Sequence, residues 1–197
     1  TLTYGAVAVP ILHEFTAEQI HNIVNHSGAK LLFVGDVVAT VIDQTKMPDL
    51  EGIIYIPDYS LVVSRTDKLT YAREHLNEMF GKKYPKYFRK EHVHYEREAS
   101  GEELALINYT SGTTGDSKGV MLTYGQYHAA LHANYEFVDV SENDRVIDFL
   151  PFTHIFERGW AYLCLSVGAQ LIINTYPQQI QQAMRETHPT CMSSVPR

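Results

Sequence analysis

The chain has 197 residues, of which 45% are hydrophobic and 20% are charged, a balance typical of a globular domain large enough to bury a core. Its formal net charge of −7 argues against a general nucleic-acid-binding protein. Its two cysteines, Cys164 and Cys191, have neither disulfide-framework nor metal-ligand spacing, which favours a reduced, cytoplasmic setting.

The first predicted elements are a strand and a helix. The apolar residues 6–11 predict a short buried strand. Thr16 precedes a run of apolar residues at helical spacing, and Gln19 follows three positions later. This pair predicts a capping box at the start of a helix. Gly28 predicts the end of the same helix, because glycine readily adopts the left-handed conformation found there.

Further strand–helix alternation follows in residues 1–56. Leu31–Val34 and residues 53–56 are short apolar runs, so they predict strands. Between them, Asp36 is expected to cap a second helix that continues to about Asp43. Because helices alternate with strands, this first segment predicts a layer of parallel strands.

Residues 57–103 differ in character from what precedes them. They are polar and rich in tyrosine, and their only helical periodicity lies near residues 69–80. Residues 81–90 contain five basic side chains and no acidic one. Such a run is typical of a solvated surface, with a phosphate- or partner-binding patch as the alternative. We expect an excursion between two regions of sheet.

Regular alternation returns in residues 104–197. The predicted strands are residues 105–109, 145–149, 170–173 and 190–195. The predicted helices are one capped by Thr123 that runs to about Tyr135, one over residues 154–166, and one over residues 177–187. The last helix begins with proline, which the first helical turn permits. Both chain ends are abrupt, since Thr1 enters an apolar run and the last strand simply stops. We therefore expect an internal fragment.

The most informative stretch is the glycine loop, residues 109–119, which reads Tyr-Thr-Ser-Gly-Thr-Thr-Gly-Asp-Ser-Lys-Gly. Its glycines let the backbone turn sharply and bring N–H groups against an anion. Its hydroxyl groups can donate to phosphate oxygens, and Lys118 adds a compact positive charge. These parts predict a triphosphate or pyrophosphate grip formed by Thr110, Ser111, Gly112, Thr113, Thr114, Gly115 and Lys118.

Two better-known nucleotide loops are excluded by the residues around this lysine. The P-loop ends in Gly-Lys-Ser/Thr, whereas Lys118 lies between Ser117 and Gly119. The dinucleotide fingerprint requires a different glycine spacing from that of positions 112, 115 and 119. A flexible turn rich in glycine, serine and threonine is the plain alternative.

The loop resembles the signature of the adenylate-forming superfamily, Ser/Thr-Ser/Thr-Gly-Thr-Thr-Gly-x-Pro-Lys-Gly. The chain departs from it once, with Ser117 in the proline position. Residues 149–158, Phe-Leu-Pro-Phe-Thr-His-Ile-Phe-Glu-Arg, resemble the superfamily's next block, Leu-Pro-x-x-His-x-Phe. Their Phe-Glu-Arg ending is most similar to the long-chain fatty acyl-CoA synthetases, and so are residues 5–11 and 194–197.

The resemblance implies an α/β fold with a three-layer, mostly parallel sheet flanked by helices. It places residues 1–197 within the superfamily's large N-terminal domain, with the C-terminal lid absent. It implies ATP, Mg²⁺ and CoA as cofactor and co-substrates and a fatty acid as substrate. Lys118 would neutralise the leaving pyrophosphate, Thr110 would contact the metal, and His154 would line the carboxylate pocket. Lys118 and His154 are thus the expected catalytic residues.

The expected reaction has two steps. A carboxylate attacks ATP to give an acyl-adenylate and pyrophosphate, and the CoA thiol then displaces AMP. We expect the isolated segment to be inactive, because the superfamily's adenine-binding block and lid lysine are missing from it. The alternatives are an adenylation domain that loads amino or aryl acids and a non-catalytic module for phosphate binding or protein contact. Amphiphilic substrates are compatible with peripheral membrane contact of the parent protein. The sequence gives no indication of oligomeric state or chain-length preference.

Overall fold

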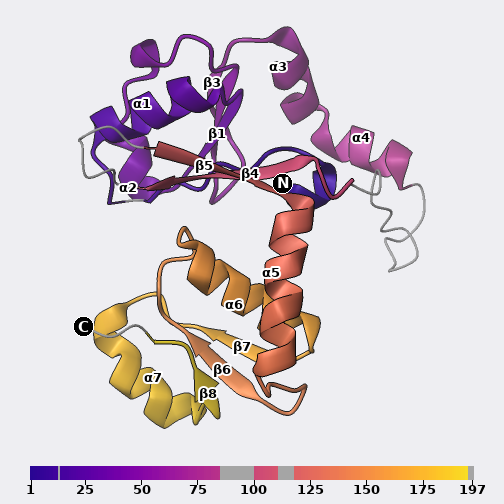
Figure 1. The fold of residues 1–197 in the computed structure, drawn as a ribbon. Coiled ribbons are helices and arrows are strands. Elements are labelled where there is room, and N and C mark those ends of the chain that lie inside the picture. The colour runs from indigo at the N-terminus through magenta and orange to yellow at the C-terminus, as the bar shows by residue number, and fades with distance from the viewer. Residues whose placement is uncertain (13, 85–99, 111–117, 195–197) are drawn as a thin grey trace. The chain divides into compact units, whose positions relative to one another are not determined.

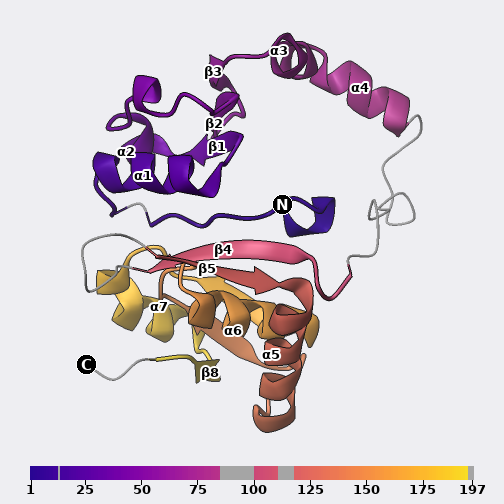
Figure 2. The same ribbon diagram turned by 45° about the horizontal axis from the view of Figure 1, so that its top comes forward.

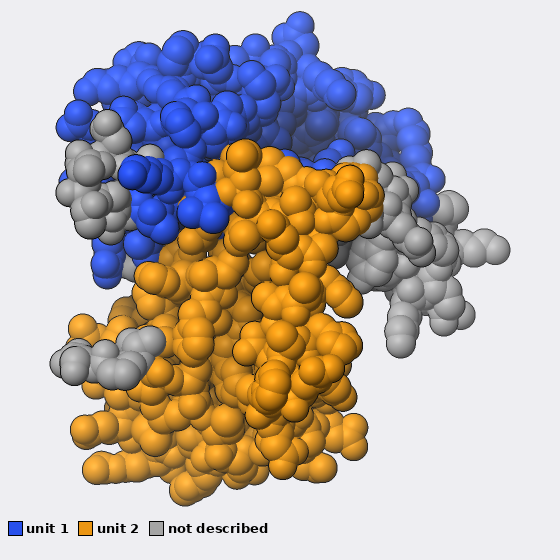
Figure 3. Space-filling model, in the orientation of Figure 1, with its two compact units in different colours: residues 1–98, 109–120 blue, residues 99–108, 121–197 orange. Residues whose placement is uncertain are grey.

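The structure is a computed structural model that describes residues 1–12, 14–84, 100–110 and 118–194 (Figure 1). The chain forms two compact units (Figure 3). Unit 1 comprises residues 1–98 and 109–120, and unit 2 comprises residues 99–108 and 121–197. Helices and strands are mixed in both units, so the α/β class predicted from the sequence is confirmed.

Unit 1 contains a sheet of three short strands in the order β1-β2-β3. Its strands are β1 (Leu31–Val34), β2 (Gly52–Tyr55) and β3 (Leu61–Ser64). Its helices are α1 (Ala17–Ser27), α2 (Asp36–Ala39), α3 (Asp67–Glu74) and α4 (Leu76–Lys83), with short 3₁₀ turns at Leu2–Tyr4 and Gln44–Lys46. Strand β1 runs parallel to β2, as predicted, whereas β3 is antiparallel to β2 and was not predicted.

The first helix begins and ends as its sequence indicates. The Thr16 hydroxyl accepts from the Gln19 amide at 3.3 Å, and the Gln19 side chain accepts from the Thr16 amide at 2.9 Å. This reciprocal pair is the predicted capping box. Gly28 ends the helix with φ of 66°. The buried face of α1 packs into the core of unit 1, formed by Ile20, Val24, Val34, Met47, Leu50 and Ile53.

Two predictions in unit 1 are wrong. Residues 6–11 form a single bridge at Ala8 instead of a strand; Pro10 lacks the N–H that a strand ladder needs. Asp36 is the first residue of α2 and not its cap, and the helix ends at Ala39 instead of Asp43. The helix ends where the Thr40 hydroxyl donates to the Val37 carbonyl at 2.9 Å. Such a bond from a side chain to the backbone competes with continuation of the helix.

One arginine organises the turn that precedes β2. The Arg65 guanidinium, just after β3, donates to the carbonyl oxygens of Gln44, Met47, Pro48 and Leu50 at 2.7 to 3.1 Å. The planar fork of an arginine can bind several acceptors at once. Backbone groups that have no sheet partner are therefore satisfied by a side chain distant in sequence.

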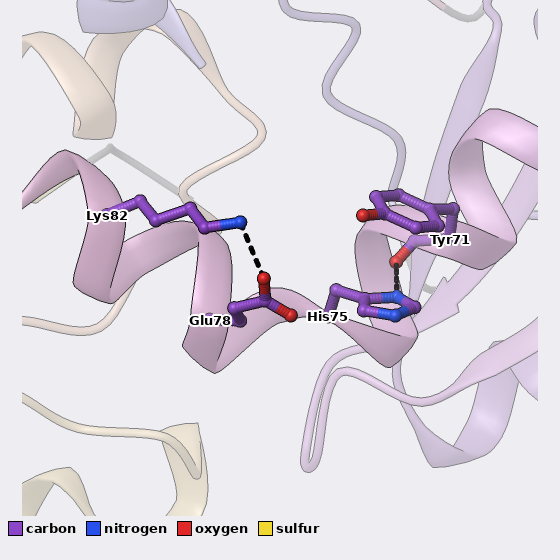
Figure 4. Close-up of polar contacts among 4 residues, drawn as sticks. All are labelled: Tyr71, His75, Glu78 and Lys82. Carbon is purple, nitrogen blue, oxygen red and sulfur yellow. Dashed lines mark hydrogen bonds and ion pairs between the residues drawn. The ribbon is translucent and has the colours of Figure 1, made fainter.

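The helical region predicted near residues 69–80 consists of two helices that meet at His75 (Figure 4). The His75 ring stacks on the Tyr71 ring with centroids 4.0 Å apart, and its Nδ1 lies 3.0 Å from the Tyr71 carbonyl oxygen. One turn further on, Lys82 forms an ion pair with Glu78 at 2.6 Å. Both ion-pair side chains are well exposed, so the pair contributes little to stability.

Unit 2 is built on a second three-stranded sheet in the order β7-β6-β8. Its strands are β6 (Arg145–Asp148), β7 (Gln170–Ile173) and β8 (Cys191–Met192), and its helices are α5 (Tyr124–Phe137), α6 (Ile155–Ser166) and α7 (Ile180–Thr187). Both pairings are parallel, as predicted. Helix α6 packs against β6 and β7, over a core formed by Val146, Cys164 and Ala169, and it lies beside α5 (Figure 2).

Strands β4 (Leu104–Thr110) and β5 (Lys118–Thr123) pair with each other and contribute residues to both units. Strand β4 confirms the prediction, whereas β5 was missed because the sequence reading assigned Lys118 to the loop. Thr123 caps α5, as predicted, and it does so through a second capping box with Gln126 that was not predicted.

Two elements of unit 2 are shorter than expected. Residues Pro177–Gln179 form a 3₁₀ turn before α7, and β8 is limited to two residues. None of the helices in the described part of the chain combines the length and apolarity that a membrane-spanning helix requires.

Candidate functional site

The base of the glycine loop is fixed on one side by Tyr109. This side chain is buried, and its hydroxyl lies 2.7 Å from Nδ1 of His26, in the last turn of α1. The two rings also meet edge to face, with centroids 5.8 Å apart. Burial raises the pKa of the Tyr109 hydroxyl, so it stays protonated at neutral pH. The end of β4 is thereby attached to α1.

Thr110 and Lys118 flank the loop. Thr110 is the last residue of β4 and Lys118 the first of β5. Both are exposed, and pairing of the two strands places them at the loop's base. In the part of the chain that the structure describes, no acidic side chain forms an ion pair with Lys118. Its charge is therefore available to an anion. The other predicted loop residues, Ser111, Gly112, Thr113, Thr114 and Gly115, lie outside the described residues.

His154 occupies the N-cap position of α6 in unit 2. Its imidazole is exposed and makes no capping hydrogen bond. The backbone holds the residue instead: the His154 amide donates to the Pro151 carbonyl at 2.9 Å, and the His154 carbonyl accepts from the Arg158 amide at 3.2 Å. The neighbouring rings of Phe152 and Phe156 are 39% and 53% exposed. The histidine therefore lies on an open, partly apolar surface.

Glu157, which entered the sequence analysis only as part of a family pattern, lies in the first turn of α6. Its side chain is fully buried. One carboxylate oxygen accepts from the amides of Phe149 and Leu150 at 3.2 and 3.1 Å. The other oxygen accepts from the Ser193 hydroxyl at 2.7 Å. The first turn of α6 is thus connected to the loop that follows β6 and to the residue after β8.

Asp148, the last residue of β6, lies beside this carboxylate and is 1% exposed. Burial, and then hydrogen bonding and repulsion with Glu157, raise its pKa from 3.8 to about 8. Neither of its carboxyl oxygens receives a hydrogen bond from a donor among the described residues. A protonated Asp148 resolves this, because its O–H can donate to the Glu157 carboxylate. The pair then carries one negative charge.

Arg158 provides a second support for the same loop. Its guanidinium is nearly buried and donates to the Phe152 carbonyl at 3.2 Å and to Oδ1 of Asn108, on β4, at 3.3 Å. Within unit 2, α6 is therefore connected to both β4 and the loop. No group of three or more His, Cys, Asp or Glu side chains in the described ranges is arranged to hold a metal ion.

The sequence of the whole chain matches one known protein family. The AMP-binding enzyme family matches residues 1–197, the whole chain.

The chain belongs to the AMP-binding enzyme family.

Curated relatives within this AMP-binding family include fatty acyl-CoA synthetases. The chain is 28% identical to the peroxisomal long chain acyl-CoA synthetase 7 of Arabidopsis thaliana, over 98% of the chain and 27% of that protein. It is 27% identical to the human long-chain-fatty-acid–CoA ligase 1, over 98% of the chain and 28% of the ligase. The chain therefore spans somewhat more than a quarter of the length of these relatives.

Solved structures show the same fold. The inhibitor-bound N-terminal domain of FACL13 from Mycobacterium tuberculosis superposes with a TM-score of 0.74 at 25% identity, over 98% of the chain and 44% of that domain. The anthranilate CoA ligase AuaEII in complex with anthranoyl-AMP gives a TM-score of 0.74 at 20% identity, over 95% of the chain and 35% of AuaEII. The prediction of an acyl-CoA ligase N-terminal-domain fold is confirmed, whereas the roles of Thr110, Lys118 and His154 stay predictions.

Proposed function

We propose that this AMP-binding chain contributes the phosphate-gripping segment of an ATP-dependent long-chain fatty acid–CoA ligase. One observation carries the proposal: the exposed Thr110 and Lys118 end two paired strands, with the glycine loop between them. The identity to long-chain ligases over nearly the whole chain supports the substrate class. The chain covers only part of those relatives, so the activity is proposed for the protein that contains these residues.

The segment's part in the reaction is electrostatic. When the fatty carboxylate attacks the α-phosphorus of ATP, the bond to the β-phosphate oxygen breaks and pyrophosphate leaves as an anion. Lys118, with no acidic partner among the described side chains, is free to offset that charge. Such stabilisation requires donors held in place before the reaction, and the partly buried Tyr109–His26 contact holds the loop's base. The CoA thiol then displaces AMP to give the thioester.

Magnesium is compatible with the residues present. Thr110 offers one exposed hydroxyl oxygen, and Mg²⁺ accepts oxygen ligands, often taking most of them from water and nucleotide phosphates. When bound, the ion would neutralise phosphate charge. The described part of the chain offers no group of three His, Cys, Asp or Glu side chains for it, consistent with an ion that arrives with the nucleotide.

Lys118→Ala tests the proposal in the intact protein that contains these residues. We expect fatty-acid-dependent pyrophosphate release to fall at least about tenfold, because a charge-assisted contact to the leaving group is lost. Lys68→Ala, an exposed lysine on α3, is the matched control and should leave the rate unchanged. An unchanged rate in Lys118→Ala would remove the loop from the mechanism.

Substrate identity is tested with the same assay. Fatty acids of graded chain length, an aryl acid and an amino acid are compared at equal concentration. Preference for the aryl or amino acid would favour an adenylation domain for those acids. Absence of pyrophosphate release with every acid, together with retained ATP binding, would favour a non-catalytic phosphate-binding module. A cytoplasmic location belongs to the same proposal and is supported by the free thiols of Cys164 and Cys191.

A further inference from the structure

The loop of residues 149–154, between β6 and α6, is held by buried groups that the proposed reaction does not itself use. Its first two amides, at Phe149 and Leu150, donate to the Glu157 carboxylate. Its carbonyl at Phe152 accepts from Arg158. The loop ends at His154, whose imidazole makes no capping hydrogen bond to α6.

Resting on the function proposed above, we propose that Glu157 is a positioning residue: paired with Asp148, it holds the loop of residues 149–154 so that His154 faces the acid substrate.

The chemistry of Glu157 suits this role better than packing alone would. Burying a carboxylate fully costs free energy of folding unless hydrogen-bond donors surround it. Here two backbone amides and the Ser193 hydroxyl already converge on Glu157, and a protonated Asp148 is the fourth donor. Hydrogen bonds to a charged acceptor are shorter and stronger than neutral ones. The loop's first two residues are therefore fixed relative to the first turn of α6.

Position along the chain connects this anchor to His154. Glu157 lies in the first turn of α6, and His154 is the N-cap residue of that helix. Holding Phe149 and Leu150 against that turn fixes both ends of the short loop, and the Arg158 contact fixes its middle. Loss of the carboxylate would leave the partly buried amides of Phe149 and Leu150 without an acceptor, so the loop would rearrange. His154 would move with it.

The pair also gives the proposal a pH dependence. The titratable groups that face Asp148 are Glu157 and Cys164 on α6, and Cys191 on β8 faces Cys164. The pKa of Cys164 is raised to about 12 by burial, then by Cys191 and Asp148, so this thiol stays neutral when Asp148 ionises near its pKa of about 8. Above that pH the two buried carboxylates repel each other. Glu157 then also loses the hydrogen bond that protonated Asp148 donates.

The experiment uses acid-dependent ATP–pyrophosphate exchange in the intact protein, a reaction that does not involve the CoA thiol. Glu157→Ala should lower kcat/KM for the fatty acid at least tenfold while KM for ATP changes less than twofold. Glu157→Gln keeps an acceptor for the two amides and should recover most of that loss. Glu142→Gln, an exposed glutamate of unit 2, is the control and should match the wild type.

The pH profile separates positioning from a general structural role. In the wild type, kcat/KM for the acid should fall above about pH 8. Asp148→Asn supplies a permanent N–H donor to Glu157, so it should keep activity within threefold at pH 7 and lose that alkaline fall. Asp139→Asn, an exposed carboxyl of unit 2, should keep the wild-type profile.

The outcomes are distinguishable. A wild type that exchanges pyrophosphate with fatty acids, together with an unaffected Glu157→Ala variant, would overturn the positioning role alone. The positioning role would also be overturned if Glu157→Ala impaired the kinetic parameters for the fatty acid and for ATP equally. The same holds if kcat/KM for the acid still fell above about pH 8 in Asp148→Asn. A wild type with no acid-dependent exchange would overturn the proposed function and the positioning role together.

Discussion

The proton held by Asp148 has a measurable effect on stability. Its pKa rises from 3.8 to about 8 on folding, through burial first and Glu157 second. Between those values the folded chain keeps the proton and the unfolded chain releases it. The favourable contribution of this group is therefore complete below about pH 4 and is lost as pH rises toward 8.

The magnitude follows from one proton. The free energy of unfolding should decrease as pH rises through this window, by on the order of 1 kcal/mol per pH unit. Asp148→Asn removes the titrating group, so its curve should lack this decrease. Asp43, Asp58 and Asp144 have pKa values below their ordinary 3.8, chiefly through hydrogen bonds, so they titrate outside the window.

Denaturant unfolding followed by tryptophan fluorescence provides the assay. Trp160 is the only tryptophan in the sequence, and it packs against the core of unit 2, so its fluorescence reports on the unit that contains Asp148. Asp139→Asn is the control, because it makes the same substitution at an exposed site. Parallel pH curves for the wild type and Asp148→Asn would refute the conclusion that Asp148 is protonated in the folded chain.

Three further substitutions test the packing described above. Gly125→Ala would place a Cβ 2.7 Å from the Gly101 carbonyl oxygen and should destabilise unit 2 by about 1 to 3 kcal/mol, measured by Trp160 fluorescence. Gly159→Ala meets nothing within 4 Å and should stabilise α6 by about 0.5 to 1 kcal/mol in the same assay; a loss would refute the open environment. Tyr109→Phe removes the contact with His26 and should cost about 1 kcal/mol, seen as faster amide exchange in α1 and unchanged exchange in α6.

Elements with strong local determinants were predictable from the sequence. Thr16 and Thr123 both cap helices as predicted, and the capping box predicted at Thr16 is present, because a cap involves residues only three positions apart. Strands β1 and β7 lie at their predicted residues. Their apolar runs are bounded by glycine or polar residues, so local pattern was sufficient.

Elements defined by distant partners were not predictable in this way. Strand β3 is short and lies in a polar segment, and it exists through its pairing with β2. Residues 6–11 are apolar enough for a strand, yet no ladder forms along them. Strand identity depends on the neighbour as much as on the residues themselves.

The same distinction applies to the candidate site. The loop residues could be recognised because they are contiguous and resemble a family signature. The buried Asp148–Glu157 pair could not, because its meaning depends on Ser193, which is far away in sequence, and on burial. A charged residue in the first turn of a helix ordinarily indicates a favourable dipole interaction. Nothing local shows that Glu157 faces inward.

The turn held by Arg65 has a consequence for how the polypeptide acquires its shape during synthesis. Among the described residues, the carbonyls of residues 48 and 50 find a donor only in Arg65, while those of residues 44 and 47 accept from Arg65 and also from the amides of Met47 and Leu50. Arg65 leaves the ribosome after all of them. The turn of residues 44–50 must remain solvated until Arg65 emerges, so the turn before β2 forms its final contacts late. Lysine at this position would supply a point charge in place of a planar fork and would leave nascent chains exposed to chaperones and proteases for longer.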